Sequence, residues 1–439
     1  MNEDYLGLGA AARRLEHCPE FEKFGKVIQL TGNLIEAEGV KCALGDICRI
    51  TPPDGAAPIY AEVVGFQKKR LKLSPLTPLT GISPGNPVQP HRQANSVPVG
   101  RELLGRVLDG LGQPIDGLGP IRPERCYPLH GQFVNPLERP LIQEQLDVGL
   151  RSVNTLLPIG KGQRVGIFAG SGVGKSTLLG MMARYTSAPV NVIALIGERG
   201  REVNEFLEKE LGPEGKAHSV VIVATSDQPA TVRVRGAYMA CAVAEYFRDE
   251  GMDVFLMMDS VTRFAMAARE IGLAAGEPPT TKGYTPSVFA QLPRLLERSG
   301  NFDRASVTGI YTVLVEGDDM EDPIADALRS ILDGHIVLDR TLAQSRHFPA
   351  INVLKSVSRL TDRLLDKEAK VLAGKFTRVL STYKNAEDMI RIGAYVRGSH
   401  PDTDYAIGRI DSLNAFLRQA VEERCTIDEA RTEIDELFK

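Results

Sequence analysis

The residues best suited to phosphate chemistry form one glycine-rich segment, which reads AGSGVGKST. It follows the apolar run RVGIF and opens a segment with helical spacing, STLLGMMARYT. In this setting glycines let successive backbone N–H groups face phosphate oxygens, and the helix start adds partial positive charge. We expect Lys175 to reach β- and γ-phosphates and the Ser176 hydroxyl to ligate Mg²⁺. The predicted nucleotide-binding residues are Ala169, Gly170, Ser171, Gly172, Val173, Gly174, Lys175, Ser176 and Thr177.

The first position of this segment departs from the G-x-x-x-x-G-K-[ST] pattern, because Ala169 stands where glycine is usual. Alanine tolerates most turn geometries but not a positive φ. The loop is therefore expected to start from an ordinary backbone conformation.

A carboxylate suited to metal binding follows another apolar run. Asp259 ends VFLMMD, and at the end of a buried strand it is expected to hold Mg²⁺ through the water shell that this ion retains. The alternative is that Asp259 caps the helix predicted for VTRFAMAAR, since aspartate is a favoured N-cap.

A second carboxylate, Glu198, follows the run NVIALIG and is next to Arg199. Ligands of open α/β sheets bind at the carboxyl ends of the strands. There Glu198 is the candidate for activating the attacking water, and Arg199 the candidate for holding the γ-phosphate. Glu202 is expected to support them. The alternative is that these residues form a surface ion-pair network.

An arginine from a neighbouring subunit commonly completes sites of this kind. The spacing of the residues alone does not select one, and the candidates are Arg263, Arg298, Arg340 and Arg359.

These residues require a sheet that brings several strand ends together. From about residue 160, apolar runs alternate with helical segments, which is typical of a parallel sheet buried on both faces. Residues 25–88 contain short β-type runs separated by Gly, Pro and Asn, which predict a small antiparallel barrel or sandwich. Residues 1–24 have near-helical spacing, and the chain beyond 361 predicts amphipathic helices, including IDSLNAFLRQAVEER.

The predicted fold class is therefore α/β, a parallel-sheet P-loop core with a small N-terminal β-barrel and a C-terminal helical domain. Its expected boundaries are 1–24 for a docking helix, 25–90 for the barrel, 91–360 for the P-loop domain and 361–439 for the helices.

Composition narrows the class of protein. The 439 residues carry a formal net charge of -4, which disfavours a general nucleic-acid binder. The one basic run of the predicted barrel, KKRLK, is interpreted as a solvated strand edge.

No cysteines form a C-x-x-C pair, which favours reduced thiols. With neither a signal peptide nor an apolar run of about 18 residues, the expected location is cytoplasmic, with membrane contact only through partners.

Several motifs in order resemble the flagellar protein export ATPase family. They are AGSGVGKST, IGERGREV, FLMMDSVTRFA, GEPPTTKGYTPSVFAQLPRLLER, YTVLVEGDDMEDPIADALRSILDGHIVLDR and FPAINVLKSVSRL. This family is similar to the type III secretion ATPases of injectisomes and, more distantly, to catalytic subunits of rotary ATP synthases. The resemblance extends from about residue 25 to about residue 398.

The resemblance implies a RecA-like ATPase core and roles for individual residues. It implies that Lys175, Ser176 and Asp259 bind phosphate and Mg²⁺, that Glu198 is the catalytic glutamate, and that Arg199 contacts the γ-phosphate. It further implies that Arg359, in SVSR, is the arginine finger that reaches the neighbouring subunit's site.

Phe348 falls where relatives place an aromatic ring against adenine, although core packing is a physical alternative. The resemblance also implies a homohexamer that binds ATP and Mg²⁺ and works at the cytoplasmic face of the inner membrane. The implied partners are a regulatory stator-like protein, the export gate, chaperones and protein substrates, with no nucleic acid.

Three other assignments stay open from the sequence. An injectisome ATPase shares the chemistry, and a rotary synthase subunit would need a dissimilar partner subunit in the ring. A nucleic-acid translocase of the transcription-terminator type would need aromatic or basic clusters on the barrel. A non-enzymatic nucleotide sensor is disfavoured by Glu198 and Asp259.

Overall fold

The computed structural model describes residues 24–53, 56–91, 95–131, 134–315, 319 and 321–439. The chain divides into two compact units, Met1–Asn95 and Ser96–Lys439, each considered by itself. The predicted N-terminal helix, 1–24, falls almost wholly outside the described residues. Within the described part of the chain, no helix combines the length and the apolar composition needed to span a membrane.

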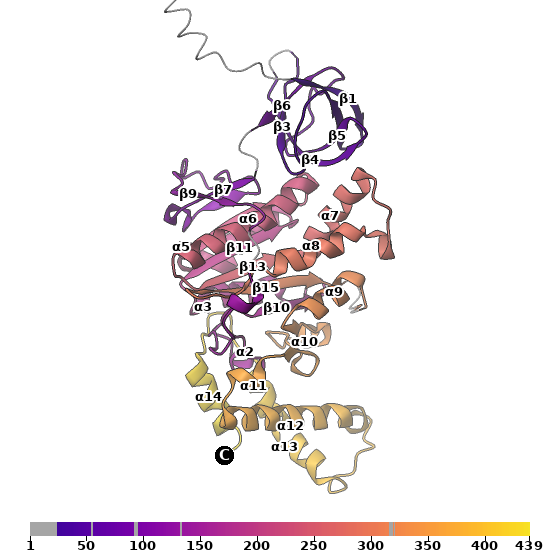
Figure 1. Cartoon of the computed structure of the whole chain (residues 1–439). Helices are drawn as coiled ribbons and strands as arrows, with labels where there is room; N and C mark the ends of the chain where they lie inside the picture. The colour runs from indigo at the N-terminus through magenta and orange to yellow at the C-terminus, as the bar shows by residue number, and fades with distance from the viewer. Residues whose placement is uncertain (1–23, 54–55, 92–94, 132–133, 316–318, 320) are drawn as a thin grey trace, which may run out of the picture. The chain divides into compact units, whose positions relative to one another are not determined.

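The first unit is a closed antiparallel β-barrel (Figure 1) with the strand order β1-β2-β5-β4-β3-β6. Its strands alternate buried and exposed residues, and the inward side chains of Ile35, Val63 and Leu73 are fully buried. The sequence left a barrel and a sandwich open, and β6 decides for the barrel because it pairs with both β1 and β3. The strands are β1 (Gly25–Thr31), β2 (Leu34–Glu38), β3 (Ile47–Ile50), β4 (Ile59–Gln67), β5 (Arg70–Pro75) and β6 (Pro87–His91).

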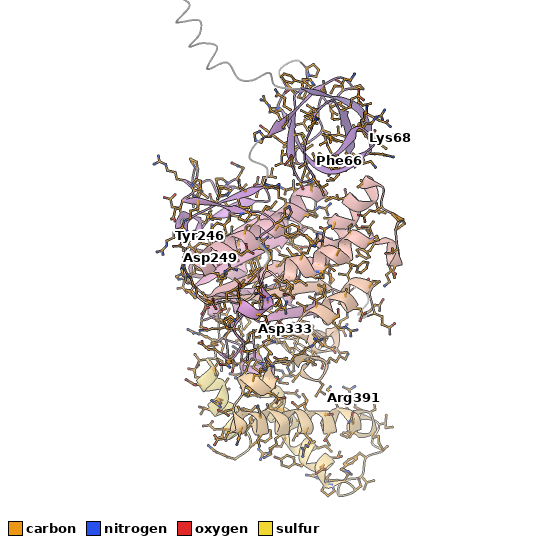
Figure 2. All side chains as sticks on the ribbon, in the orientation of Figure 1. Phe66, Lys68, Tyr246, Asp249, Asp333 and Arg391 are labelled. Carbon is orange, nitrogen blue, oxygen red and sulfur yellow. The ribbon has the colours of Figure 1, made fainter. Side chains whose placement is uncertain are left out.

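The basic run lies at the β4–β5 hairpin, where Figure 2 labels Phe66 and Lys68. Arg70 of this run pairs with Glu36 on the adjacent strand β2, at 2.9 Å between Nη1 and Oε2. This ion pair agrees with the interpretation that the run is solvated, but the interpretation as a strand edge is wrong, because β5 pairs with both β2 and β4 in the closed barrel.

The second unit is built on a nine-stranded sheet with the order β17-β16-β10-β15-β13-β11-β12-β8 and with β14 paired to β15. All pairings from β16 to β8 are parallel, and β11 and β12 are buried along their whole length, as the apolar runs predicted. The strands are β8 (Val107–Asp109), β10 (Arg164–Ala169), β11 (Val190–Ile196), β12 (Ser219–Ala224), β13 (Val254–Asp259), β14 (Gly300–Asn301), β15 (Ser306–Leu314), β16 (Gly334–Val337) and β17 (Val357–Ser358).

Helices connect these strands and cover the sheet (Figure 1). They are α2 (Arg151–Leu156), α3 (Lys175–Tyr185), α4 (Gly200–Glu205), a π-helical turn (Phe206–Leu211), α5 (Gly212–Ala217), α6 (Ala230–Asp249), α7 (Val261–Ala275), α8 (Pro286–Leu296), α9 (Pro323–Ile331) and α10 (Arg340–Gln344). A separate pair of strands, β7 (Ser96–Val99) and β9 (Arg125–Pro128), lies against α6. There the Tyr127 hydroxyl donates to Asp249, and that of Tyr246 donates to Glu124, both at 2.9 Å; Tyr246 and Asp249 are labelled in Figure 2.

The C-terminal part is helical, as predicted. Its elements are α11 (Thr361–Leu364), α12 (Lys367–Arg391), α13 (Pro401–Leu417) and α14 (Ile427–Glu436). One prediction here is wrong in extent, because the helix expected through IDSLNAFLRQAVEER ends at Leu417. Arg151 donates to the carbonyls of Phe416 and Arg418, and those contacts replace further helical hydrogen bonds.

Candidate active site

The phosphate-loop segment connects β10 to α3. Ala169 is the last residue of β10, so it has the ordinary extended backbone that its side chain requires, as predicted. Gly172 and Gly174 have φ values of 75° and 87°, a region that disfavours residues with a β-carbon. The two glycines thus permit the turn that leads into α3, which begins at Lys175.

Lys175 lies between the two carboxylates that the sequence singled out. Its Nζ donates to Asp259 Oδ1 at 2.5 Å and to Glu198 Oε1 at 3.5 Å. The three side chains are only 6–14% exposed. Burial favours a neutral amine, but the two carboxylates outweigh it and raise the pKa of Lys175. The structure therefore brings Lys175, Glu198 and Asp259 together as one buried charged cluster.

Sheet topology explains this convergence. Asp259 ends β13, Glu198 follows β11, and Lys175 begins the helix after β10. All three strands are parallel members of one sheet, so their carboxyl ends share one edge.

Thr312 is a member of this cluster that the sequence analysis did not identify. Its hydroxyl donates to Asp259 Oδ1 at 2.6 Å from β15, the strand between β10 and β13. The signal available in the sequence was the presence of the hydroxyl residues Thr308, Tyr311 and Thr312 in the run TGIYTVLV, whose other residues are apolar or glycine. A buried hydroxyl needs a hydrogen-bond partner, and for Thr312 that partner is the carboxylate.

The pKa of Glu198 is raised to about 7. Burial is the main cause, because it penalises the charged form. The Lys175 ammonium lowers this pKa, whereas the Asp259 charge and the hydrogen bond with Glu202 raise it. A carboxylate with a pKa near neutrality is suited to accept a proton from water.

Arg199 is the predicted residue that lies apart from the cluster in this structure. Its side chain is 80% exposed, and Nη1 lies 3.4 Å from Glu202 Oε1. Within α4, Arg201 makes a similar ion pair with Glu205, with 3.1 Å between Nε and Oε1. The surface ion pairs weighed as an alternative are therefore present beside Glu198, and they leave Arg199 exposed beside the site.

The oxygen atoms here fit Mg²⁺. Among the described residues, no three His, Cys, Asp or Glu side chains form a metal site by themselves. Ser176 offers an exposed hydroxyl at the start of α3, and Asp259 offers a carboxylate. This set of few, hard ligands is typical of Mg²⁺, which keeps several waters and binds substrate phosphates.

The arginine candidates differ in exposure. Arg298 is buried, and its guanidinium donates twice to Glu245 at 2.7 Å, so it is not available to a neighbouring subunit. Arg263 packs under Gly197 and is half-buried. Arg340 is exposed and lines a cavity of about 310 Å³ beside Ala169 and Gly170.

Arg359 is exposed as well and follows β17. Its Nη2 donates to the carbonyl of Arg329 at 2.9 Å, and its backbone N–H donates to that of Asp333. A guanidinium on the surface, held by one carbonyl contact, remains accessible to an adjacent molecule.

Phe348 lies against the phosphate loop. A β-carbon at Gly174 would be 3.3 Å from its ring, and the ring is 44% exposed. An exposed aromatic face beside the loop is less consistent with the core-packing alternative than with contact to a flat ligand.

Comparison with known proteins gives the same assignment along nearly the whole chain. Residues 149–358 match the nucleotide-binding domain of the ATP synthase alpha/beta family, and residues 365–436 match the type III secretion EscN ATPase C-terminal domain. The flagellum-specific ATP synthase of Bacillus subtilis is 53% identical over 423 residues, with 95% of each chain covered. The type 3 secretion system ATPase of Xanthomonas euvesicatoria is 49% identical, with 91% of each chain covered.

A solved structure is similar throughout. It is the assembled ATPase EscN of an enteropathogenic E. coli type III secretion system in complex with its central stalk EscO. The TM-score is 0.87 at 41% identity, and the match covers 94% of this chain and all of that one. Because relatives that are 53% and 49% identical cover 95% and 91% of its length, this chain belongs to the family of flagellum-specific ATP synthases and type III secretion ATPases.

Proposed function

We propose that this ATPase hydrolyses Mg²⁺-bound ATP at the Lys175 cluster and that hydrolysis energises delivery or unfolding of substrates in flagellar type III protein export. The observation that carries the proposal is the Lys175 ammonium between Glu198 and Asp259 at the start of α3. Phosphate oxygens would compete with the carboxylates for this ammonium, because all of them are anionic hydrogen-bond acceptors.

The loop residues Ala169–Thr177 would bind the phosphates through backbone N–H groups and Lys175. The Ser176 hydroxyl and Asp259 would hold Mg²⁺, Asp259 through water. When bound, the ion neutralises charge on the β- and γ-phosphate oxygens. Thr312 supports this role, because its hydrogen bond fixes the Asp259 carboxylate.

Glu198 would orient and deprotonate the attacking water. Its raised pKa supports this, since a base that titrates near neutrality both accepts and releases the proton readily. Arg199 would turn from Glu202 toward the γ-phosphate, a movement that its exposure permits.

Phe348 would contact the adenine ring. The exposed ring beside Gly174 supports this, because aromatic side chains stack on flat bases.

A closed ring of identical subunits would complete each site. One chain carries both the Glu198 cluster and the exposed Arg359, so a head-to-tail contact that closes can supply the arginine to every neighbouring site. The relative solved as an assembled ATPase with a central stalk supports a homohexamer with a stalk-like partner.

The proposed division of labour follows the predicted boundaries. Residues 1–24 would dock on a regulatory stator-like protein and the export gate, 25–90 would form the barrel, and 91–360 the motor. Residues 361–439 would contact chaperones and protein substrates. The ring would then work in the cytoplasm at the inner membrane, held there by partners and without nucleic acid.

An injectisome ATPase is the second candidate, favoured by a type III secretion relative nearly as similar as the flagellar one. Neighbouring genes for flagellar rod, hook or chemotaxis proteins would support the flagellar assignment, and needle-complex genes the alternative. A rotary synthase subunit would require a dissimilar partner, so active hexamers of the purified chain alone would exclude it.

The variant Lys175→Ala tests the proposed chemistry. We expect it to lose most ATP affinity and nearly all hydrolysis, because among the described residues Lys175 is the ammonium that pairs with both the Glu198 and the Asp259 carboxylates. Isothermal titration with ATP and Mg²⁺, together with release of inorganic phosphate, would measure both. Lys161→Ala is the matched control, because Lys161 pairs with Glu144 and Asp253 away from the phosphate loop. ATP affinity unchanged in Lys175→Ala would contradict the proposal.

A further inference from the structure

The chain that follows α13 reaches the same region as the phosphate loop. Helix α13 ends at Leu417, and residues 418–425 return to the P-loop core without helix or strand, through a turn at residues 421–422, before α14 begins. We call residues 418–425 the return segment.

Gln419 is the most connected residue of the return segment. Its backbone N–H donates to the carbonyl of Phe348 at 3.0 Å. Its side-chain amide donates to the carbonyls of Gly149 at 2.8 Å and Glu423 at 2.7 Å, and its oxygen accepts from the backbone N–H of Arg151, also at 2.8 Å. With 6% of its surface exposed, Gln419 has each side-chain polar atom bonded to protein.

The surroundings hold the return segment against α3, the helix that begins at Lys175. The carbonyl of Val421 accepts from the Tyr185 hydroxyl at 2.9 Å and from the Arg184 guanidinium at 3.0 Å, both in the last turn of α3. The Cys425 carbonyl accepts from Asn154 at 3.0 Å. Hydrogen bonds therefore hold the return segment near its start, at Gln419, and at its end, at Cys425.

Gly149 shows how close this packing is. A β-carbon there would approach that of Tyr185 to 2.2 Å, and its φ is 70°. The Gly149 carbonyl accepts from both Gln419 and the backbone N–H of Cys425. The loop before α2, the end of α3 and the return segment therefore meet at one point.

From these contacts we propose that Gln419 is a positioning residue for Phe348, and that through Phe348 it contributes to the affinity of the site for the nucleotide base. The backbone bond from Gln419 fixes the Phe348 carbonyl, while the side-chain bonds fix Gln419 to the core that carries the phosphate loop. The proposal rests on the role proposed above for Phe348. It assigns base affinity to a residue of the C-terminal part that lies outside the nucleotide-binding motifs.

The proposal predicts that loss of Gln419 weakens binding of the nucleotide base and leaves binding of the phosphates unchanged. Phosphates would contact the loop and Lys175, which Gln419 does not touch, whereas the base would contact Phe348. Loss of the Gln419 side-chain bonds would let the return segment and Phe348 shift. It would leave the buried backbone N–H of Arg151 without its Gln419 acceptor and would remove one of the two hydrogen bonds to the Gly149 carbonyl. The affinity for a nucleotide should fall, and the affinity for a triphosphate without a base should not.

The test is Gln419→Met in the full chain, because methionine has a similar length and no comparable hydrogen bonds. Binding of ADP and of inorganic tripolyphosphate, each with Mg²⁺, is measured by isothermal titration. We expect ADP affinity to fall by about tenfold, in line with the loss of buried hydrogen bonds, and tripolyphosphate affinity to stay within about twofold of wild type. In steady-state ATP hydrolysis KM should rise with kcat nearly unchanged, since the bonds lost act in binding.

A double-mutant cycle with Phe348→Ala tests whether Gln419 acts through Phe348. If it does, Gln419→Met adds little to the loss of ADP affinity caused by Phe348→Ala. Arg409→Met is the control, because Arg409 lies on α13 and donates to the Leu437 carbonyl at 3.0 Å, away from Phe348. It should bind ADP as wild type does.

Gln419→Glu is a second variant in case Gln419→Met does not fold. It keeps the oxygen that accepts from Arg151 and loses the donor to Gly149, so the same selective loss should be smaller. Unchanged ADP affinity, equal losses for ADP and tripolyphosphate, or additive losses with Phe348→Ala would each overturn the positioning role. If wild type binds no tripolyphosphate, the phosphate site itself is wrong.

Discussion

At the scale of single residues, the site depends on one ammonium shared by two carboxylates. Lys175 lies closer to Asp259 than to Glu198, and Thr312 donates to the same Asp259 oxygen. Asp259 therefore accepts two hydrogen bonds, whereas Glu198 has a long contact to Lys175, a hydrogen bond with Glu202 and a raised pKa. The two carboxylates are thereby suited to different tasks, because two donors hold Asp259 in place while Glu198 titrates near neutrality.

The pH profile of hydrolysis should follow Glu198. Its pKa of about 7 means that the free enzyme carries the protonated acid below neutrality and the competent base above it. We expect kcat/KM to rise with pH through about 7 and then to level off. Glu198→Gln should bind ATP, lose steady-state hydrolysis by about 10²–10⁴-fold and lose this dependence on pH.

Phosphate release measured from mildly acidic to mildly alkaline pH checks this prediction. Glu205→Gln is the matched control, because Glu205 pairs with the exposed Arg201 one turn along α4. Wild-type turnover in Glu198→Gln, with the wild-type pH profile, would contradict the assignment of the base.

At the scale of elements, the parallel sheet determines which residues meet. Strand β15 lies between β10 and β13 although it comes after both in the chain. This order brings Thr312 to Asp259 and carries the phosphate loop to the same edge as Glu198. The helix α6 supports the sheet from one side, and its Glu245 is buried with Arg298.

The Arg298–Glu245 pair should be important for stability. Arg298 also donates to the carbonyls of Leu129 and Tyr238, so it links α6, the chain after α8 and the segment after β9. Arg298→Met would leave the Glu245 carboxylate buried without its cation, which typically costs about 3–5 kcal/mol. We expect a clear loss in the free energy of unfolding measured with urea.

The double variant Arg298→Met with Glu245→Leu should recover part of that loss, because replacing both charges by apolar groups removes the unpaired carboxylate. Arg304→Met is an exposed control, since Arg304 makes one contact to the Asp249 carbonyl. A single Arg298→Met variant as stable as wild type would show that the pair contributes nothing.

At the scale of the whole molecule, the proposed ring makes function depend on assembly. Arg359 is on the surface and the Glu198 cluster is buried in the same chain, so one subunit would supply both parts of the proposed shared site. Hydrolysis per subunit should then rise steeply with protein concentration as rings form.

Mixing two inactive variants tests the contribution from a neighbour. Arg359→Ala should hydrolyse ATP poorly, with a loss on the order of 10³-fold or more if it acts as an arginine finger. Mixed with Glu198→Gln, it should regain some activity, because some interfaces then carry an intact Glu198 and an intact Arg359. The measurement is phosphate release at concentrations where light scattering detects hexamers.

Arg363→Ala serves as the control, because Arg363 is close to Arg359 in the chain but lies in the following helix, α11. It should keep wild-type hydrolysis. Mixed hexamers that form without any recovery of activity would contradict the role of Arg359 across the interface.

The sequence by itself determined the elements and most of the cluster. Apolar runs such as those of β11 and β12 specify strands buried on both faces, and glycine spacing specifies the loop before Lys175. Carboxylates that follow such strands must share one sheet edge, so Glu198 and Asp259 could be placed together before any coordinates. The closed barrel was less determined, because β2 and β6 are short and their pairing depends on distant strands.

Only the tertiary structure decided which polar residues are paired and with what. On spacing alone Arg298 and Arg359 were equal candidates, and only the resemblance singled out Arg359. Burial beside Glu245 removes Arg298, while Arg359 is exposed. The local sequence pattern could not predict that α13 ends at Leu417, because the amphipathic spacing continues to residue 424. Contacts from Arg151 and Phe348, more than 60 residues away in the chain, compete with helical hydrogen bonds and turn the chain back. Long-range hydrogen bonds of this kind have no signature in local spacing, and they carry the return segment to the nucleotide site.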